Sequence, residues 1–234
     1  MSMLKRLWPR RRRPREVVDP ARLLERAEPV SRQFGFDRGQ PIDRYYIEAF
    51  LHQHRSDVAG RVLEIGAPTY TRLLGGRGVQ SEVLHAVEGN RDATLVGDLA
   101  SGEGIPADFA DCFILTQTLP FIADCRAALA SVHRTLRPGG VVLATVPGIS
   151  QISRYDMDRW GDYWRFTTRS AEMLFGEVFG AENVEVVSYG NVLAAAAFLY
   201  GLASDELPRE RLDSRDGDYQ LLIGVRAVKP GGGA

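Results

Sequence analysis

The chain has 234 residues, 44% of them hydrophobic, so it can bury one sizeable core, and we expect one domain with a short appendage. Its net charge is −1, and the absence of any run of 18 or more apolar residues excludes a predicted membrane-spanning helix. Cys112 and Cys125 lack metal-ligand spacing, so we predict no metal site and read them as buried thiols of a cytoplasmic protein.

The N-terminal segment differs in charge from the rest of the chain. Residues 1–15 carry seven basic groups and no acid, whereas residues 16–234 carry 22 basic and 30 acidic groups. We predict a basic disordered arm over residues 1–19, most simply a solvated tail. A second interpretation is peripheral contact with the anionic inner face of a membrane, because Leu4, Leu7 and Trp8 flank the charges. Nucleic-acid binding is disfavoured, because the acidic body would repel phosphate.

Apolar runs and helical periodicities alternate along residues 20–228. This pattern predicts one doubly wound α/β domain with a mostly parallel sheet, preceded by a helical lid over 20–58 and followed by a flexible tail over 229–234. The predicted strands are 62–65, 83–87, 94–96, 111–118, 141–146, 184–188 and 219–228. The predicted helices are 21–28, 42–58, a turn at 71–74, 123–136, 168–179 and 192–202.

The most informative stretch is 61–76, RVLEIGAPTYTRLLGG. A short buried strand runs straight into Gly66, with Glu64 near the strand's end, and the next apolar run ends in Glu88. In a doubly wound sheet the ligand crevice forms at the carboxyl ends of the strands, where an acid can accept hydrogen bonds from ribose hydroxyls. The order strand, glycine, helix, strand, acid therefore predicts a nucleotide-type site.

Several short motifs in order carry a family likeness. VLEIG, VEGN, VGDLA, ILTQTL and LRPGG followed by VVLATVP resemble the class I, Rossmann-like methyltransferases that use S-adenosylmethionine, and DYWRFTT resembles their small-molecule and glycan-associated members. The resemblance covers residues 40–228 and implies seven strands with an antiparallel last strand beside the sixth. Pro68 and Tyr70 stand where the family usually has two further glycines, and Pro120 where many relatives have a histidine.

The resemblance also implies residue roles toward S-adenosylmethionine. Gly66 would allow close backbone approach to the methionine part, and Glu64 would orient the loop or a water near the ammonium. Glu88 would hold the ribose diol, and Asp98 with Leu99 the adenine amino group. Thr116 and Gln117 would face the methionine part, and Arg44, on the helix before the first strand, would pair with the carboxylate.

The acceptor side is predicted in the segment RYDMDRWGDYWR, residues 154–165, which combines carboxylates with large aromatic rings. We expect the longer stretch 148–167 that contains it to form a wall of the acceptor pocket, with Asp162 as the general base and Asp156 as second choice. The predicted acceptor-binding residues are Trp160, Tyr163, Trp164 and Arg165. The alternative is a capping loop, in which the aromatics bury the sheet edge and Arg165 pairs with an acid.

These patterns predict a methyltransferase acting on a small-molecule or glycan acceptor, at oxygen, in glycan or natural-product biosynthesis. The alternative is a catalytically inactive partner protein of the same fold, which the two missing glycines motivate. A nicotinamide-dependent oxidoreductase is disfavoured, because no G-x-G-x-x-G follows the first strand and the two lysines, Lys5 and Lys229, lie in the tails. The oligomeric state is left open.

Overall fold

The structure is a computed structural model that describes residue 23 and residues 25–231. The basic arm predicted over residues 1–19 therefore lies outside the described residues. Within the described part, no helix is long and apolar enough to cross a membrane.

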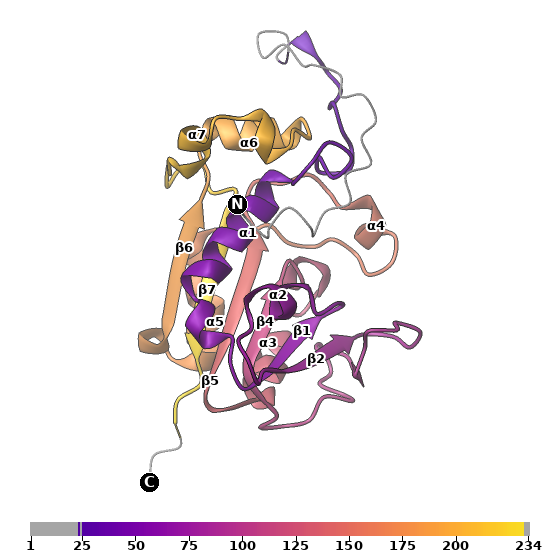
Figure 1. The fold of residues 1–234 in the computed structure, drawn as a ribbon, viewed down its shortest axis with the longest axis vertical. Helices are drawn as coiled ribbons and strands as arrows, with labels where there is room; N and C mark the ends of the chain where they lie inside the picture. The colour runs from indigo at the N-terminus through magenta and orange to yellow at the C-terminus, as the bar shows by residue number, and fades with distance from the viewer. Residues whose placement is uncertain (1–22, 24, 232–234) are drawn as a thin grey trace.

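A single seven-stranded sheet forms the centre of the molecule (Figure 1), in the order β3-β2-β1-β4-β5-β7-β6. Strand β7 runs antiparallel to both β5 and β6, and the pairs from β3 to β5 are parallel. This confirms the predicted doubly wound sheet with an antiparallel last strand. The strands are β1 (Arg61–Ile65), β2 (Gln80–His85), β3 (Leu95–Val96), β4 (Ala110–Thr116), β5 (Leu136–Pro147), β6 (Val184–Tyr189) and β7 (Leu222–Val228).

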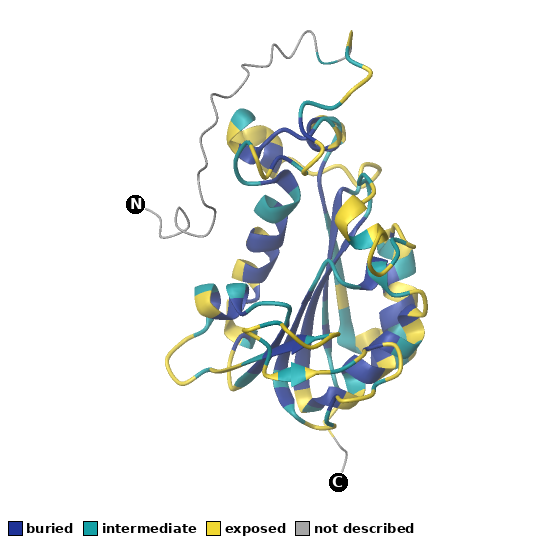
Figure 2. Cartoon of the chain, turned by 90° about the vertical axis from the view of Figure 1, so that its right-hand side faces the viewer, coloured by how far each residue is buried: buried dark blue, intermediate teal, exposed yellow. Residues whose placement is uncertain are grey.

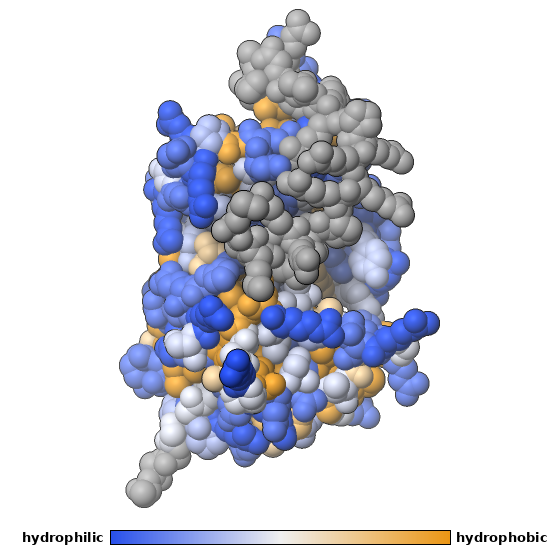
Figure 3. Space-filling model, in the orientation of Figure 1, coloured by the Kyte–Doolittle hydropathy of each residue, from blue (hydrophilic) through white to orange (hydrophobic). Residues whose placement is uncertain are grey.

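Helices cover both faces of the sheet, because successive side chains of a strand point to opposite faces. In β4, Phe113 and Leu115 join the core under α3 (Cys125–Thr135) and α5 (Thr168–Phe179). Cys112 and Ile114 join the core formed with α1 (Ile42–Gln53), α2 (Thr69–Leu74) and α6 (Val192–Leu199). Figure 2 shows the central strands buried between these layers, and Figure 3 shows the hydropathy of the surface in the orientation of Figure 1. The short elements are α4 (Arg154–Met157), α7 (Arg209–Asp213) and four 3₁₀ turns, Arg55–Asp57, Leu119–Phe121, Ala181–Asn183 and Ser204–Glu206.

Some element boundaries differ from the sequence prediction. Residues 26–28 of the predicted helix over 21–28 are not helical. Strand β2 ends at His85, not at residue 87, because its partner β3 pairs only with Leu84 and His85. Lys229, at the start of the predicted flexible tail, has its backbone N–H bonded to the Gly140 carbonyl at 2.8 Å.

Candidate active site

A cleft of about 1580 Å³ opens at the carboxyl ends of the parallel strands. Its floor includes Ile65 at the end of β1, Leu84 in β2, Thr116 at the end of β4 and Pro147 at the end of β5. The strand order reverses between β1 and β4, which is where ligands bind in doubly wound sheets. Pockets for one small ligand are usually about 300–1,000 Å³, so this cleft has room for two molecules side by side.

Gly66 forms an open stretch of backbone on the cleft wall. Its φ is +78°, and a Cβ added there would meet no atom within 4 Å. The position is fixed by two hydrogen bonds, from the Gly66 N–H to the Leu84 carbonyl (2.9 Å) and from Asn90 Nδ2 to the Gly66 carbonyl (2.6 Å). A ligand can therefore approach the backbone closely at a rigid turn. Asn90 belongs to the VEGN motif, but the sequence alone gave it no role.

Glu64 shapes the loop after Gly66. It is 3% exposed and accepts hydrogen bonds from the backbone N–H groups of Tyr70 and Thr71 (2.9 and 2.8 Å) and from the Thr71 hydroxyl (2.8 Å). Burial raises the pKa of the Glu64 carboxyl, and these hydrogen bonds partly offset that rise. Both carboxylate oxygens are thus used to hold the first turn of α2, where a negative charge is favoured.

Tyr70 and Pro68, which replace the two family glycines, have structural roles here. Pro68 directly precedes α2, and Tyr70 is 4% exposed among the apolar side chains of α1 and α2. The Tyr70 hydroxyl accepts a hydrogen bond from Arg44 Nη1 (3.3 Å), and Arg44 lines the cleft. The loop is therefore joined to α1, the helix predicted as part of the lid, and the Arg44 Nε is buried without a hydrogen-bond partner in the described part of the chain.

Three of the remaining predicted cofactor residues lie on the cleft wall close to the ends of β3 and β4. Asp98 accepts hydrogen bonds from the backbone N–H groups of Ala100 and Ser101, and Leu99 is buried beside it. Gln117 has a φ of +50°, uncommon for a residue with a side chain, and its buried Nε2 has no hydrogen-bond partner among the described residues. A buried amide without a partner on a cleft wall is suited to a ligand acceptor.

Glu88 lies one residue beyond the cleft lining. It is exposed and follows the end of β2 by three residues, whereas its neighbours Ala86 and Val87 line the cleft. The strand ends earlier than the sequence pattern suggested, so the carboxylate stands on the loop that leads to β3.

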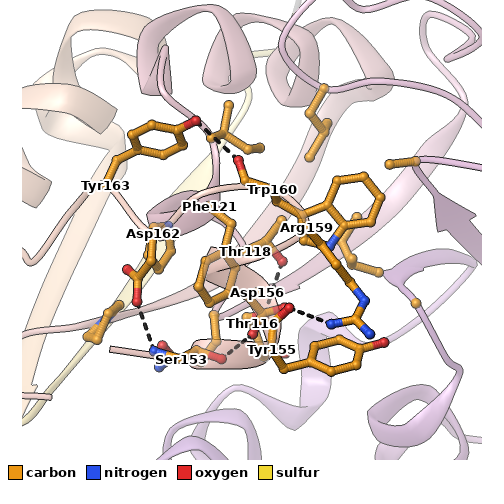
Figure 4. A pocket seen from close by; sticks show the side chains of 18 of the residues that line it. Thr116, Thr118, Phe121, Ser153, Tyr155, Asp156, Arg159, Trp160, Asp162 and Tyr163 are labelled. Carbon is orange, nitrogen blue, oxygen red and sulfur yellow. Dashed lines mark hydrogen bonds between the residues drawn. The ribbon is translucent and has the colours of Figure 1, made fainter. Parts of the chain in front are cut away.

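The loop after β5 forms the opposite wall (Figure 4), and Asp162 is tied into it. The Asp162 side chain is 1% exposed, forms two hydrogen bonds with the Arg165 guanidinium (2.5 and 3.0 Å), and accepts the Ser153 N–H (3.0 Å). Burial works to raise the pKa of Asp162, but the hydrogen bonds from Arg165 and Ser153 and the charge of Arg165 outweigh it and lower that pKa. This ion pair is the one that the capping-loop interpretation expected.

Asp156 is the less constrained carboxylate of this wall. It is half-buried, lines the cleft, and accepts one hydrogen bond from the Ser153 hydroxyl, at 2.5 Å, through Oδ2. Its Oδ1 has no partner among the described residues. Figure 4 shows Asp156 between Ser153 and the Thr116–Thr118 side of the cleft.

The aromatic residues of the segment divide between the cleft and its rim. Trp160 and Tyr163 line the cleft, and the Tyr163 hydroxyl donates to the Trp160 carbonyl (3.1 Å). Trp164 lies outside the cleft lining, with its indole N–H donating to the carbonyls of residues 122 and 123. A pair that the sequence reasoning did not single out is Tyr155 with Arg159, whose guanidinium lies 3.4 Å from the ring centroid.

No metal centre is visible in the described part of the chain, where no three His, Cys, Asp or Glu side chains are grouped to hold an ion. The two thiols are free and buried. Burial raises the pKa of Cys125 to about 11, so it is protonated and unreactive at neutral pH.

The sequence matches no protein-family model and no curated protein. Its fold, however, matches many solved structures. One is a SAM-dependent methyltransferase from Archaeoglobus fulgidus, with 10% identity and a TM-score of 0.52 over 80% of this chain and 94% of that one. A second is 1,6-didemethyltoxoflavin-N1-methyltransferase from Burkholderia thailandensis, with 18% identity and a TM-score of 0.51 over 82% of this chain and 80% of that one.

A third is the N-methyltransferase NodS from Bradyrhizobium japonicum, with 15% identity and a TM-score of 0.51 over 82% of this chain and 90% of that one. At these identities the likeness concerns the fold. The strand order and the antiparallel β7 agree with that likeness. The chain therefore has the Rossmann-like fold of the S-adenosylmethionine-dependent methyltransferases.

Proposed function

We propose that the protein is an S-adenosylmethionine-dependent methyltransferase that moves a methyl group to a hydroxyl oxygen of a small-molecule or glycan acceptor. The observation that carries this proposal is the open, rigid backbone at Gly66, on the wall of a large cleft at the switch point of a methyltransferase-like sheet. The volume of the cleft supports the proposal as well, because methyl donor and acceptor must lie in the cleft together for in-line transfer.

The cleft residues suit the proposed cofactor. Gly66 leaves room for its methionine part, and the unpartnered Gln117 amide and the Arg44 guanidinium offer donors for its carboxylate. We assign the adenine to Asp98 and Leu99, which line the cleft, and the ribose hydroxyls to Glu88, on the exposed loop directly after the cleft-lining Val87. When bound, S-adenosylmethionine supplies an electrophilic methyl group on a sulfonium centre.

Asp156 is better placed than Asp162 to serve as general base. A base must accept the proton of the acceptor hydroxyl as oxygen attacks. Both carboxylates line the cleft, but both oxygens of Asp162 already accept hydrogen bonds, whereas Asp156 keeps Oδ1 unpartnered among the described residues. We therefore assign proton removal to Asp156, and to Asp162 the positioning of Arg165 on the acceptor wall.

The proposal is tested by calorimetry with S-adenosylmethionine, S-adenosylhomocysteine and NAD. We expect the first two to bind and NAD not to bind. In Gly66→Val the new side chain would project into the open space, and affinity should fall at least about tenfold. Gly139→Val is the matched control, because Gly139 has a φ of +79°, an equally open surrounding, and a place at the other end of β5.

Failure of the wild type to bind either sulfur ligand would refute the proposal. An equal loss of affinity in the Gly66→Val and Gly139→Val variants would show that backbone strain, and not obstruction of the cleft, weakens binding. Binding without turnover over a panel of hydroxylated acceptors would instead indicate the inactive partner protein.

A further inference from the structure

Exposed hydrophobic side chains gather at the rim of the cleft. Among the described residues, fourteen large hydrophobic side chains are exposed, and six of these belong to residues 152–164. We call these six the mouth surface. They are Ile152 (51% exposed), Tyr155 (66%), Met157 (39%), Trp160 (39%), Tyr163 (53%) and Trp164 (45%).

The acceptor pocket does not account for the whole mouth surface. Tyr155, Trp160 and Tyr163 line the cleft, but Ile152, Met157 and Trp164 do not. The hydrophobic rim therefore extends outward, past the space that a bound acceptor would cover. Clustered exposed apolar residues of this kind mark binding surfaces.

The segment that follows the basic arm in the chain contacts this rim. Residue 32 is bonded to the segment just before Ile152, because Gln151 Nε2 donates to the Arg32 carbonyl (3.1 Å). In Figure 1 the first described residues and α4 lie at the same end of the molecule. From Leu23 back to Arg15 is eight residues, which span at most about 28 Å. The seven basic groups of residues 1–15 therefore precede, along the chain, a segment that contacts the cleft rim.

We infer that the mouth surface docks on an anionic phospholipid bilayer, with the basic arm supplying the electrostatic attraction. Tryptophan and tyrosine favour the membrane–water interface, and peripheral binding grows with the apolar area buried and with electrostatic attraction to anionic lipids. Residues 152–165 hold three arginines and three aspartates, so the mouth segment has no net charge that would repel anionic lipid. The charge of residues 1–15 favours an anionic bilayer as the partner, because these residues carry seven basic groups and no acid.

When the mouth surface is docked, the cleft would open toward the bilayer. An acceptor presented at the membrane surface could then enter the cleft directly. The docking itself needs neither cofactor nor turnover. Its measurement is therefore separate from the test of the proposed function, and either can fail alone.

The experiment is flotation of the full chain with vesicles of phosphatidylcholine alone, or of equimolar phosphatidylcholine and phosphatidylglycerol. We expect binding to the anionic vesicles only, weakening as salt is added. Ile152→Asp and Met157→Asp should each lower the partition coefficient about fivefold to tenfold, because each removes a half-exposed apolar side chain from the interface. Met173→Asp is the matched control, since Met173 is 49% exposed but lies on α5. Replacing Arg10–Arg13 by glutamine in the full chain should reduce binding by at least about tenfold.

A second measurement reports on the rim directly. The chain has three tryptophans, so the Trp8→Phe full-length variant keeps only Trp160 and Trp164. Brominated lipid in anionic vesicles should quench their fluorescence. The inference would be overturned if the chain bound neutral vesicles equally well. It would also be overturned if the folded Ile152→Asp and Met157→Asp variants partitioned like the wild type, or if the brominated lipid caused no quenching. A concentration-dependent dimer that Ile152→Asp abolishes would overturn it too, by assigning the surface to a second copy of the chain.

Discussion

Replacing Asp162 by asparagine should destabilise the protein rather than merely stop its chemistry. The Asp162 carboxylate is 1% exposed and is held by the Arg165 guanidinium and the Ser153 N–H. Asparagine keeps a carbonyl that can accept the Ser153 hydrogen bond, but it removes the charge that faces Arg165. The acceptor wall would then contain a guanidinium without its ion-pair partner.

The size of the effect follows from burial. Removing one partner of a fully buried ion pair costs about 3–5 kcal/mol. The Arg165 side chain is 29% exposed, so water can compensate part of the loss, and we expect about 2 kcal/mol in the free energy of unfolding. For a chain of 150–250 residues this lowers the melting temperature by roughly 4–8 °C. Asp158→Asn is the control: Asp158 pairs with Arg154 at 3.3 Å in an exposed helical turn, and its loss should cost under about 0.5 kcal/mol.

The same pair predicts a pH dependence. The pKa of Asp162 is lowered in the folded protein, so its stabilising contribution is present above the ordinary aspartate value of about 3.9 and is lost as pH falls through the folded pKa. The difference in unfolding free energy between wild type and Asp162→Asn, measured by urea titration, should be largest near neutral pH and should shrink below about pH 4. An unchanged melting temperature combined with lost turnover would refute this reasoning and return Asp162 to the role of base.

Three further outcomes test the site. Glu88→Ala should weaken S-adenosylhomocysteine binding in calorimetry about ten- to hundredfold, because a charged hydrogen-bond acceptor is lost. Asp92→Ala in the same loop is the control and should bind like the wild type. Equal affinities of the two variants would remove Glu88 from the site. Glu64→Ala should lower the unfolding free energy by about 3 kcal/mol, since three donors at the start of α2 lose their acceptor, and a near-wild-type urea midpoint would contradict that role. A chain starting at Asp19 should keep its melting temperature and its turnover of a soluble acceptor, and loss of that turnover would place the arm in the active site.

Local pattern was enough to predict the architecture. The near-continuous apolar run of β4 indicated a strand buried on both faces, and residues 112–115 are fully buried in the sheet. The alternation of strands and helices predicted the doubly wound fold, and the turn at Gly66 lies where the sequence placed it. These features depend on side-chain periodicity and on the freedom of glycine, which act within a few residues of the chain.

The hydrogen-bond partners of the carboxylates were decided by tertiary structure, and the roles proposed for them rest on those partners. A sequence shows that Asp156 and Asp162 share one segment, but both could act as base or as ion-pair partner. The conformation of the loop after β5 brings the Arg165 guanidinium and the Ser153 N–H onto Asp162 and leaves one oxygen of Asp156 free. Likewise, the two-residue pairing of β2 with β3 ends the strand at His85 and leaves Glu88 on the exposed loop beyond the cleft-lining Val87. The sequence allowed Arg165 to pair with any of the nearby acids, and only the conformation of the loop shows which one it meets.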